Sequence, residues 1–256
     1  MTQEILLRRD RAGVQRARRK RRVGLFIRDI LIILVLAVFA SFLVKTFLIR
    51  SFYIPSASME NTLMINDRII VNELVPNLVP ISRGDVVVFR DPGGWLAASP
   101  PPPNQPPLVA AVEGFLSFVG LAAPDSNDHL VKRVIGLPGD HVVCCNVRGQ
   151  MSVNGVPLTE PYINFPKGET KASADSFDVV VPKNSLWVMG DNRYMSKDSR
   201  YNTTTPLKGF VPVSNVVGRV FVISWPVSRW TWLGSYPDVF DLVPPAAKNE
   251  TTSSGK

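Results

Sequence analysis

The longest apolar run of the chain lies near its start, from residue 23 to residue 49, and reads VGLFIRDILIILVLAVFASFLVKTFLI. Its uncharged middle of 15 residues would form a helix about 22 Å long, shorter than a hydrocarbon core of about 30 Å. When the flanks are included, and the cations near both ends extend toward opposite interfaces, the run predicts one transmembrane α-helix. The charged residues of the run are Arg28, Asp29 and Lys45.

A cleaved signal peptide is the alternative interpretation of this run. Val38-Phe39-Ala40 offers small residues at a cleavage spacing. The apolar run continues beyond Ala40, however, and a long basic segment precedes it. A retained membrane anchor over residues 23–49 is therefore favoured.

After residue 49 the pattern changes to short runs of β-branched and aromatic residues separated by Gly and Pro, which is typical of strands. Asn154-Gly155 lies between two such runs and predicts a tight hairpin turn. We therefore expect a mostly β domain of antiparallel β-sheets, anchored by the one N-terminal transmembrane α-helix. The expected strands are Phe52–Ile54, Arg68–Val71, Asp85–Phe89, Leu130–Ile135, Val142–Cys145, Met151–Val153, Phe177–Val181, Ser185–Met189 and Val216–Ser224.

Two segments interrupt the β pattern. Residues 93–128 begin with Gly93-Gly94 and continue through SPPPPNQPP, which predicts a polyproline-like arm outside the sheets. The second half of this insertion, LVAAVEGFLSFVGLAA, is short for another span, and we expect it to rest on the domain or on the membrane surface. The polar C-terminus predicts a disordered tail. The predicted order is a basic segment (1–22), the anchor (23–49), the β-rich domain with its insertion (50–243) and the tail (244–256).

The basic excess of the chain is confined to its N-terminus. The formal net charge is +8, and residues 1–28 alone hold ten Lys or Arg against two acidic residues. The remaining 228 residues hold 19 basic and 19 acidic residues, so the β domain has no overall field that would attract nucleic acid. A basic segment before an apolar span instead places residues 1–22 in the cytoplasm and the β domain on the outer side.

Histidine and metal chemistry have little support in the sequence. The two histidines, His129 and His141, lie in no metal-binding pattern such as His-Glu-x-x-His, and the cysteines form no Cys-x-x-Cys pair. We therefore expect no cofactor and no metal, and we expect both histidines to flank strands or face solvent. A serine enzyme outside the cell that lacks a histidine base needs another base, and lysine is the known alternative.

Lys132 lies in the most suggestive setting for such a base. In DHLVKRVIGLPGD the strand alternation places it on one face with Leu130 and Val134, with no carboxylate beside it. An apolar setting lowers the pKa of an amine, and a shift from about 10.4 to about 8 requires roughly 3 kcal/mol. The alternative, which the strand position alone favours, is an edge-strand lysine whose amine reaches water.

Four stretches of the chain stand out as a set of motifs: IPSASMENTL (54–63), RGDVVVFRDP (83–92), HLVKRVIGLPGD (129–140) and GDNRYMSKDSR (190–200). In this order they resemble the motifs of bacterial type I signal peptidases, which are membrane-bound serine proteases of the Ser-Lys dyad class. Pro-Ser-x-Ser-Met alone is a modest signal, but four motifs after an apolar anchor are specific, and the resemblance extends to about Val220. Asn61 stands where the first motif usually has proline, and Tyr194 and Met195 replace a polar pair in the last.

The resemblance implies a role for each matching position. Ser58 would be the nucleophile and Lys132 the general base, while the Ser58 backbone N–H and the Ser56 hydroxyl would form the oxyanion hole. Ser196 would orient the lysine. The last motif would also supply an ion-paired scaffold from Asp191, Arg193, Asp198 and Arg200. Apolar residues near the dyad would line the substrate pockets, with ordinary β-core packing an equal alternative for each: Ile54, Pro55, Met59, Leu63, Leu130 and Val131.

The implied activity is that of an endopeptidase at the outer face of the cytoplasmic (plasma) membrane of a bacterium. It would remove N-terminal signal peptides from secretory preproteins by cutting after small-x-small sites, with the lipid bilayer and the secretion machinery close by and no nucleic acid. Ser58 follows the anchor closely because such a substrate is itself held in the membrane. Two other functions stay open. A self-cleaving Ser-Lys repressor is disfavoured by the anchor, and the other alternative is a non-catalytic, membrane-tethered β module that binds a secretion partner.

Cys144 and Cys145 are adjacent in a predicted strand, so their side chains should diverge. Their Cα atoms, about 3.8 Å apart across a trans peptide, lie closer than in most disulfides. We therefore expect two free or separately buried thiols rather than a vicinal disulfide.

Overall fold

The computed structural model describes residues 25–41, 49–96, 106 and 128–246. The chain divides into two units, Met1–Thr46 and Phe47–Lys256. In the first unit residues 25–41 are helical, and no helix within the described ranges is long and apolar enough to cross a membrane. The predicted basic segment, both ends of the predicted anchor, nearly all of the proline-rich insertion and most of the predicted tail lie outside the described residues.

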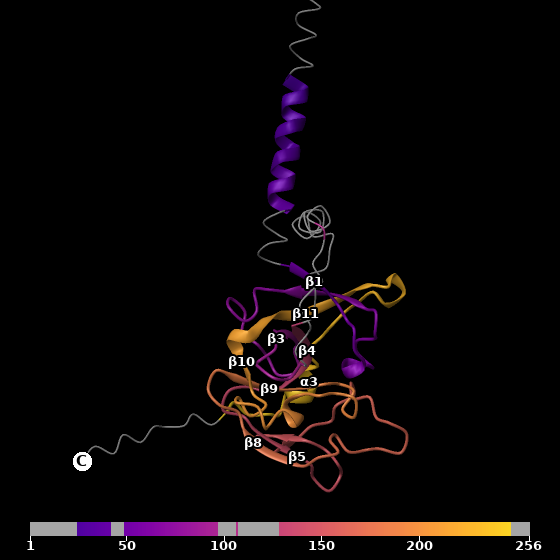
Figure 1. Cartoon of the computed structure of the whole chain (residues 1–256), viewed down its shortest axis with the longest axis vertical. Helices are drawn as coiled ribbons and strands as arrows, with labels where there is room; N and C mark the ends of the chain where they lie inside the picture. The colour runs from indigo at the N-terminus through magenta and orange to yellow at the C-terminus, as the bar shows by residue number, and fades with distance from the viewer. Residues whose placement is uncertain (1–24, 42–48, 97–105, 107–127, 247–256) are drawn as a thin grey trace, which may run out of the picture. The chain divides into compact units, whose positions relative to one another are not determined.

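The second unit consists of two antiparallel β-sheets (Figure 1). The larger sheet has the order β1-β2-β11-β3-β4-β9-β10, with β12 paired to β11, and the smaller has the order β7-β6-β5-β8. The strands of this unit are β1 (Ile49–Tyr53), β2 (Arg68–Asn72), β3 (Val86–Arg90), β4 (His129–Gly136), β5 (His141–Cys144), β6 (Ser152–Val153), β7 (Val156–Pro157), β8 (Phe177–Val180), β9 (Ser185–Met189), β10 (Val211–Pro212), β11 (Val216–Trp225) and β12 (Thr231–Trp232). Its helices are η1 (Ala57–Met59), η2 (Ser199–Tyr201), η3 (Val213–Asn215), η4 (Val227–Arg229) and α3 (Pro237–Phe240).

The prediction of a mostly β, antiparallel domain is confirmed. Each of the nine expected strands overlaps an observed strand, and Asn154-Gly155 forms the turn between β6 and β7 with positive φ at both residues. Three strands of two residues each were not predicted. β7 and β10 each contain a proline, which removes a ladder donor and hides a strand from sequence patterns.

The strand β4 connects the hydrophobic clusters of this unit. Val131 packs beside the cluster of Phe52 and Met59, Leu130 and Val134 belong with a second cluster, and Ile135 belongs to a third. β4 pairs with β3 from His129 to Arg133 and with β9 from Arg133 to Gly136, so its first residues have one unpaired side among the described residues. Pairing with β3 and contacts with the hydrophobic clusters therefore fix the middle of β4, which carries Lys132.

The connection between β3 and β4 begins and ends on a fixed stem. Arg90 pairs with His129, and the Asp91 backbone N–H donates to the Asp128 carbonyl over 2.9 Å. The Asp91 carboxylate accepts hydrogen bonds from the backbone N–H groups of Gly93, Trp95 and Leu96. The stem therefore fixes the chain up to the start of the predicted insertion.

Residues 233–246, called here the C-terminal segment, pack back onto the sheets. Gly84 has a φ of 85°, and a Cβ atom there would lie 1.8 Å from the Ser235 carbonyl oxygen, so only glycine permits this close approach. Phe240 and Val243 are buried in the cluster of Ile135. The Pro244 carbonyl, at the start of the predicted tail, accepts hydrogen bonds from Arg83 and Asn154.

The expectation of free cysteine thiols is wrong. Cys144 and Cys145 are joined in a vicinal disulfide. β5 ends at Cys144, so Cys145 is outside the strand and the alternation that would separate the two side chains does not apply to it.

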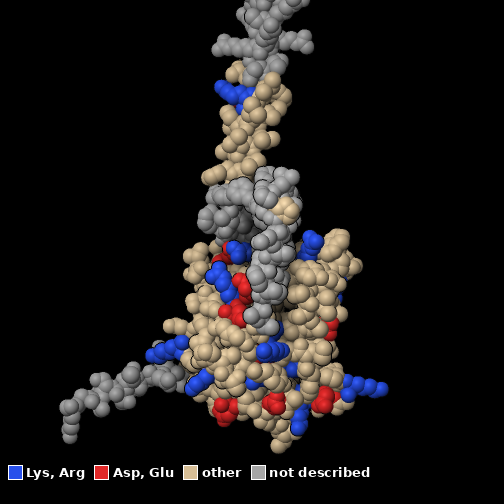
Figure 2. All heavy atoms as spheres, viewed as in Figure 1, with Lys and Arg blue, Asp and Glu red and all other residues tan. Residues whose placement is uncertain are grey.

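Acidic and basic side chains are interspersed on the face shown in Figure 2, with no large area of one sign. This distribution agrees with the balance of charges beyond residue 28.

Candidate active site

Ser58 lies in the short helix η1, directly after the edge strand β1. The turn is held by backbone hydrogen bonds, including one from the Leu63 N–H to the Met59 carbonyl over 2.8 Å. Met59 and Leu63 are buried in the core, at 1% and 0% exposure. Ser58 is itself 7% exposed. The apolar residues on either side of the turn therefore fix the serine in a nearly buried position.

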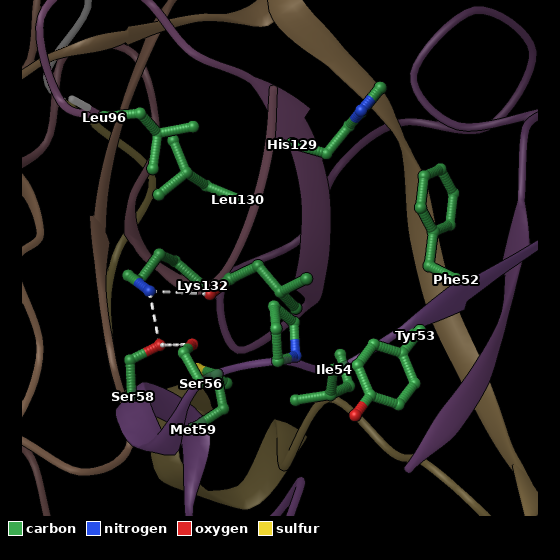
Figure 3. A pocket seen from close by; sticks show the side chains of 12 residues that line it. Phe52, Tyr53, Ile54, Ser56, Ser58, Met59, Leu96, His129, Leu130 and Lys132 are labelled. Carbon is green, nitrogen blue, oxygen red and sulfur yellow. Dashed lines mark hydrogen bonds between the residues drawn. The ribbon is translucent and has the colours of Figure 1, made fainter. Parts of the chain in front are cut away.

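Lys132 approaches Ser58 from the middle of β4. Its Nζ lies 2.6 Å from Ser58 Oγ and 2.9 Å from the Val131 carbonyl oxygen (Figure 3). The lysine is only 3% exposed, so the alternative of an edge-strand amine in water is wrong. Burial lowers the Lys132 pKa to about 8, although the charges of Asp198 and Asp191 act in the opposite direction. The amine therefore becomes neutral at a lower pH than an ordinary lysine, and a minor part of it is already neutral near physiological pH.

Ser56 lies beside the dyad at the surface. Its Oγ is 3.4 Å from Ser58 Oγ, and the residue is exposed (Figure 3). A hydroxyl in this position can turn toward a negative oxygen that forms where Ser58 attacks a carbonyl group.

The dyad opens into a pocket of about 220 Å³. Five of the six predicted substrate-contact residues line it: Ile54, Pro55, Met59, Leu130 and Val131. The prediction for Leu63 is wrong, because its side chain is fully buried in the core and does not line this pocket. Four further residues that line the pocket were not predicted from the sequence: Phe52, Tyr53, Leu96 and His129.

These four residues extend the pocket in two directions. In Figure 3, Leu96 and Leu130 lie on the side of Lys132, whereas Phe52, Tyr53 and His129 lie farther along the pocket. His129 is the first residue of β4, in line with the expected place at the end of a strand, and its ring packs against Phe52 with ring centroids 5.2 Å apart. No sequence signal identified Leu96, because its position depends on the Asp91 stem.

The four predicted scaffold residues all form buried ion pairs, two of them with each other. Asp198 and Arg200 form an ion pair of 2.8 Å, with both side chains buried. Asp191 does not pair with Arg193. Asp191 instead binds Arg133 over 2.6 Å, and Arg193 binds Glu160 over 2.6 Å. Arg133 and Glu160 were not predicted as members of the scaffold, although Arg133 is adjacent to Lys132 and the strand alternation places it on the other face of β4.

Ser196 is close to the dyad but does not bind the lysine in this structure. Its Oγ is buried and has no hydrogen-bond partner among the described residues. A Cβ atom added to Gly190 would lie 2.3 Å from Ser196 Oγ and 2.4 Å from the Ser58 carbonyl oxygen. Ser196 is thus held near Ser58 across Gly190, and its hydroxyl is available for another partner.

Asn61 explains one departure from the family motif. Its φ is 88°, which the ring of proline cannot adopt. The Asn61 side-chain amide donates to the Tyr162 carbonyl over 3.1 Å. The asparagine therefore belongs to a local turn that a proline would disrupt.

A buried lysine amine within hydrogen-bond distance of a serine hydroxyl, beside an apolar pocket, is the arrangement used by serine hydrolases of the Ser-Lys class. The family model described as "Signal peptidase, peptidase S26" matches residues 27–225. The chain therefore belongs to the signal peptidase family S26, and the resemblance found in the sequence is confirmed.

Two relatives with similar sequences agree with this assignment. A protein of Mycobacterium leprae named "Probable signal peptidase I" is 40% identical over 187 residues, which cover 66% of this chain and 64% of the relative. A "Signal peptidase I" of Mycobacterium tuberculosis is 41% identical over 175 residues, which cover 64% of this chain and 59% of the relative. The chain thus spans less than two thirds of the length of these relatives. A solved signal peptidase I of Enterococcus faecalis is 25% identical, with a TM-score of 0.35, and the match covers 54% of this chain and 95% of that chain.

Proposed function

We propose that the protein is a signal peptidase I that removes N-terminal signal peptides from secretory preproteins. The observation that carries this proposal is the Lys132 Nζ to Ser58 Oγ distance of 2.6 Å at a buried site. Membership of family S26 supports the same activity. The remaining geometry supports a specific role for each group.

In the proposed reaction, neutral Lys132 takes the proton of Ser58 Oγ as that oxygen attacks the scissile carbonyl carbon. The Ser58 backbone N–H and the Ser56 hydroxyl stabilise the oxyanion that results. The protonated lysine then gives its proton to the leaving amine, which leaves an ester on Ser58. Lys132, neutral again, deprotonates a water molecule that hydrolyses the ester and restores the serine.

The substrate would bind as an extended strand. The first residues of β4 pair with β3 on one side, and among the described residues their other side is unpaired beside the pocket. Main-chain hydrogen bonds to this edge would give affinity, and the pocket would select small side chains. A pocket of only about 220 Å³ favours small side chains, which supports cleavage after small-x-small sites.

The anchor completes the proposal. Residues 23–49 would form a single transmembrane helix with the basic N-terminus in the cytoplasm and the β domain outside, at the cytoplasmic membrane of a bacterium. The support is the apolar run and the ten cations in residues 1–28. The dyad would then act near the outer membrane surface, where a preprotein presents its cleavage site close to the secretion machinery.

The test is cleavage of a secretory preprotein by the full-length chain in detergent, with Edman sequencing of the product. We expect cleavage after a small-x-small site by the wild type, and none by Ser58→Ala or Lys132→Met. Ser176→Ala and Lys183→Ala, which change exposed residues, are the matched controls and should retain activity.

The pH dependence gives a second measurement. Because Lys132 must be neutral to act and its pKa is lowered to about 8, kcat/KM should rise as the pH is raised through about 8 and then level off.

In the cleavage assay, a folded wild type that cleaves no preprotein would favour the tethered binding module. Activity retained in Lys132→Met would show that another group is the base.

A further inference from the structure

Arg133, the neighbour of Lys132, occupies a buried cation site. The guanidinium is 0% exposed. Its Nε donates to Asp191 Oδ1 over 2.8 Å, its Nη2 to Asp191 Oδ2 over 2.6 Å and its Nη1 to the Gly84 carbonyl over 2.7 Å. A buried arginine of this kind depends on complete pairing, because an unpaired buried charge is strongly unfavourable.

Two tyrosine rings complete the cation site. The guanidinium carbon lies 4.0 Å from the ring centroid of Tyr162 and 5.2 Å from that of Tyr236. The two rings pack against each other with centroids 5.1 Å apart. Tyr162 is 1% exposed and Tyr236 is 40% exposed, so Tyr236 is the ring that stands between this site and water.

The backbone of Tyr236 has an unusual conformation. Its φ is 50° and its ψ is 58°, in the left-handed region that bulky residues rarely adopt. The residues around it are held firmly: Ser235 lies against Gly84, and Phe240 is in the core. An unfavourable conformation that persists at a well-packed position indicates that the placement of the ring matters.

The Arg133 site is connected to the nucleophile. The Asp191 carboxylate that binds Arg133 also accepts the hydroxyl of Thr62, four residues after Ser58. The next residue, Asn192, donates its backbone N–H to the Ser58 carbonyl over 3.1 Å. The same carboxylate is one of the two charges that raise the Lys132 pKa against the effect of burial. Both members of the dyad thus depend on where Asp191 lies.

We propose that Tyr236 is a positioning residue for the Ser58-Lys132 dyad, because its ring closes the cation site of Arg133 and so fixes Asp191 and the Ser58 turn. Tyr236 lies beyond the family match, which ends at residue 225. The C-terminal segment therefore belongs to the functional unit. This inference rests on the proposed peptidase activity for its kinetic consequences, but its structural part does not require that activity.

The kinetic test compares Tyr236→Ala with Tyr236→Phe in the full-length chain. Tyr236→Ala should lower kcat at least tenfold with little change in KM, and should move the rise of kcat/KM to lower pH, because an Asp191 carboxylate that is no longer held in place raises the Lys132 pKa less. Tyr236→Phe keeps the aromatic face and should behave as the wild type. Leu242→Ala changes an 82% exposed side chain of the same segment and is the matched control.

A second readout needs no substrate. Hydrogen exchange measured by mass spectrometry on a peptide covering residues 56–65 should be faster in Tyr236→Ala only. If the wild type cleaves no preprotein but this exchange pattern holds, the proposed function fails and the positioning role stands. The positioning role is overturned if Tyr236→Ala exchanges as the wild type does, if an active Tyr236→Ala keeps the wild-type pH profile, or if Tyr236→Phe is as impaired as Tyr236→Ala.

Discussion

Replacing Lys132 with methionine should make the protein more stable near neutral pH while removing its activity. The lysine is 3% exposed, and burial lowers its pKa from 10.5 to about 8. Because the folded state holds this proton less tightly than the unfolded chain, the buried charge opposes folding. At about 1.4 kcal/mol for each pKa unit, the opposition amounts to about 3 kcal/mol.

The sign of the pH dependence follows from the same two values. Below about pH 8 both states carry the proton and the full penalty is present, whereas between about 8 and 10.5 the folded state loses the proton first and the penalty fades. The unfolding free energy of Lys132→Met minus that of the wild type should therefore shrink by roughly 2–3 kcal/mol between pH 7 and pH 10. The variant also loses the hydrogen bonds of the amine, which lowers its unfolding free energy by about 1 kcal/mol each, and this loss depends little on pH.

The assay is equilibrium unfolding in urea of both full-length proteins in the same detergent, followed by tryptophan fluorescence. All five tryptophans lie after residue 94, so the signal reports on the β-rich unit. Lys183→Met, at an exposed position, should change the free energy of unfolding by less than about 0.5 kcal/mol at every pH. A difference between Lys132→Met and the wild type that stays constant from pH 7 to pH 10 would refute the reasoning.

Two further predictions concern the surroundings of the dyad. Ser56→Ala removes a hydroxyl 3.4 Å from Ser58 Oγ. Steady-state kinetics should show kcat reduced about 10²-fold with little change in KM, since the hydroxyl would act on the transition state. A change confined to KM would contradict this role. Gly190→Ala should reduce kcat at least tenfold, because its Cβ atom would lie 2.4 Å from the Ser58 carbonyl oxygen and the backbone must shift. Gly234→Ala, where no atom lies within 4 Å of the new Cβ, is the control and should be neutral in the same assay.

Much of the fold was predictable because short alternating runs between Gly and Pro mark strands whatever their partners. The contact between Ser58 and Lys132 could be predicted for a different reason, because each residue lies inside a compact motif. Leu63 shows what a motif does not reveal. It is only five residues from Ser58, yet the turn directs its side chain into the core and away from the pocket.

The ion pairs were the least predictable part of the site. Arg193 binds Glu160, which is 33 residues earlier in the chain, and their contact depends on how the loop before β8 packs against the larger sheet. Asp191 was within two residues of an arginine in the sequence but selected Arg133 instead. Because partners of buried charges are chosen by the tertiary fold, a motif reveals which charges are present but not how they pair.

The stem at Asp91 determines how freely the loop between β3 and β4 can change length. The pairing of Arg90 with His129 sets the register of β3 and β4 at the base of the loop. Three backbone N–H groups bind the Asp91 carboxylate where the loop begins. Once such a hairpin is closed, each doubling of the connecting loop adds only about 0.6 kcal/mol of closure entropy. Evolution or protein engineering can therefore lengthen or exchange this connection while Lys132 keeps its register, which makes the stem a natural graft point for new sequence beside the pocket.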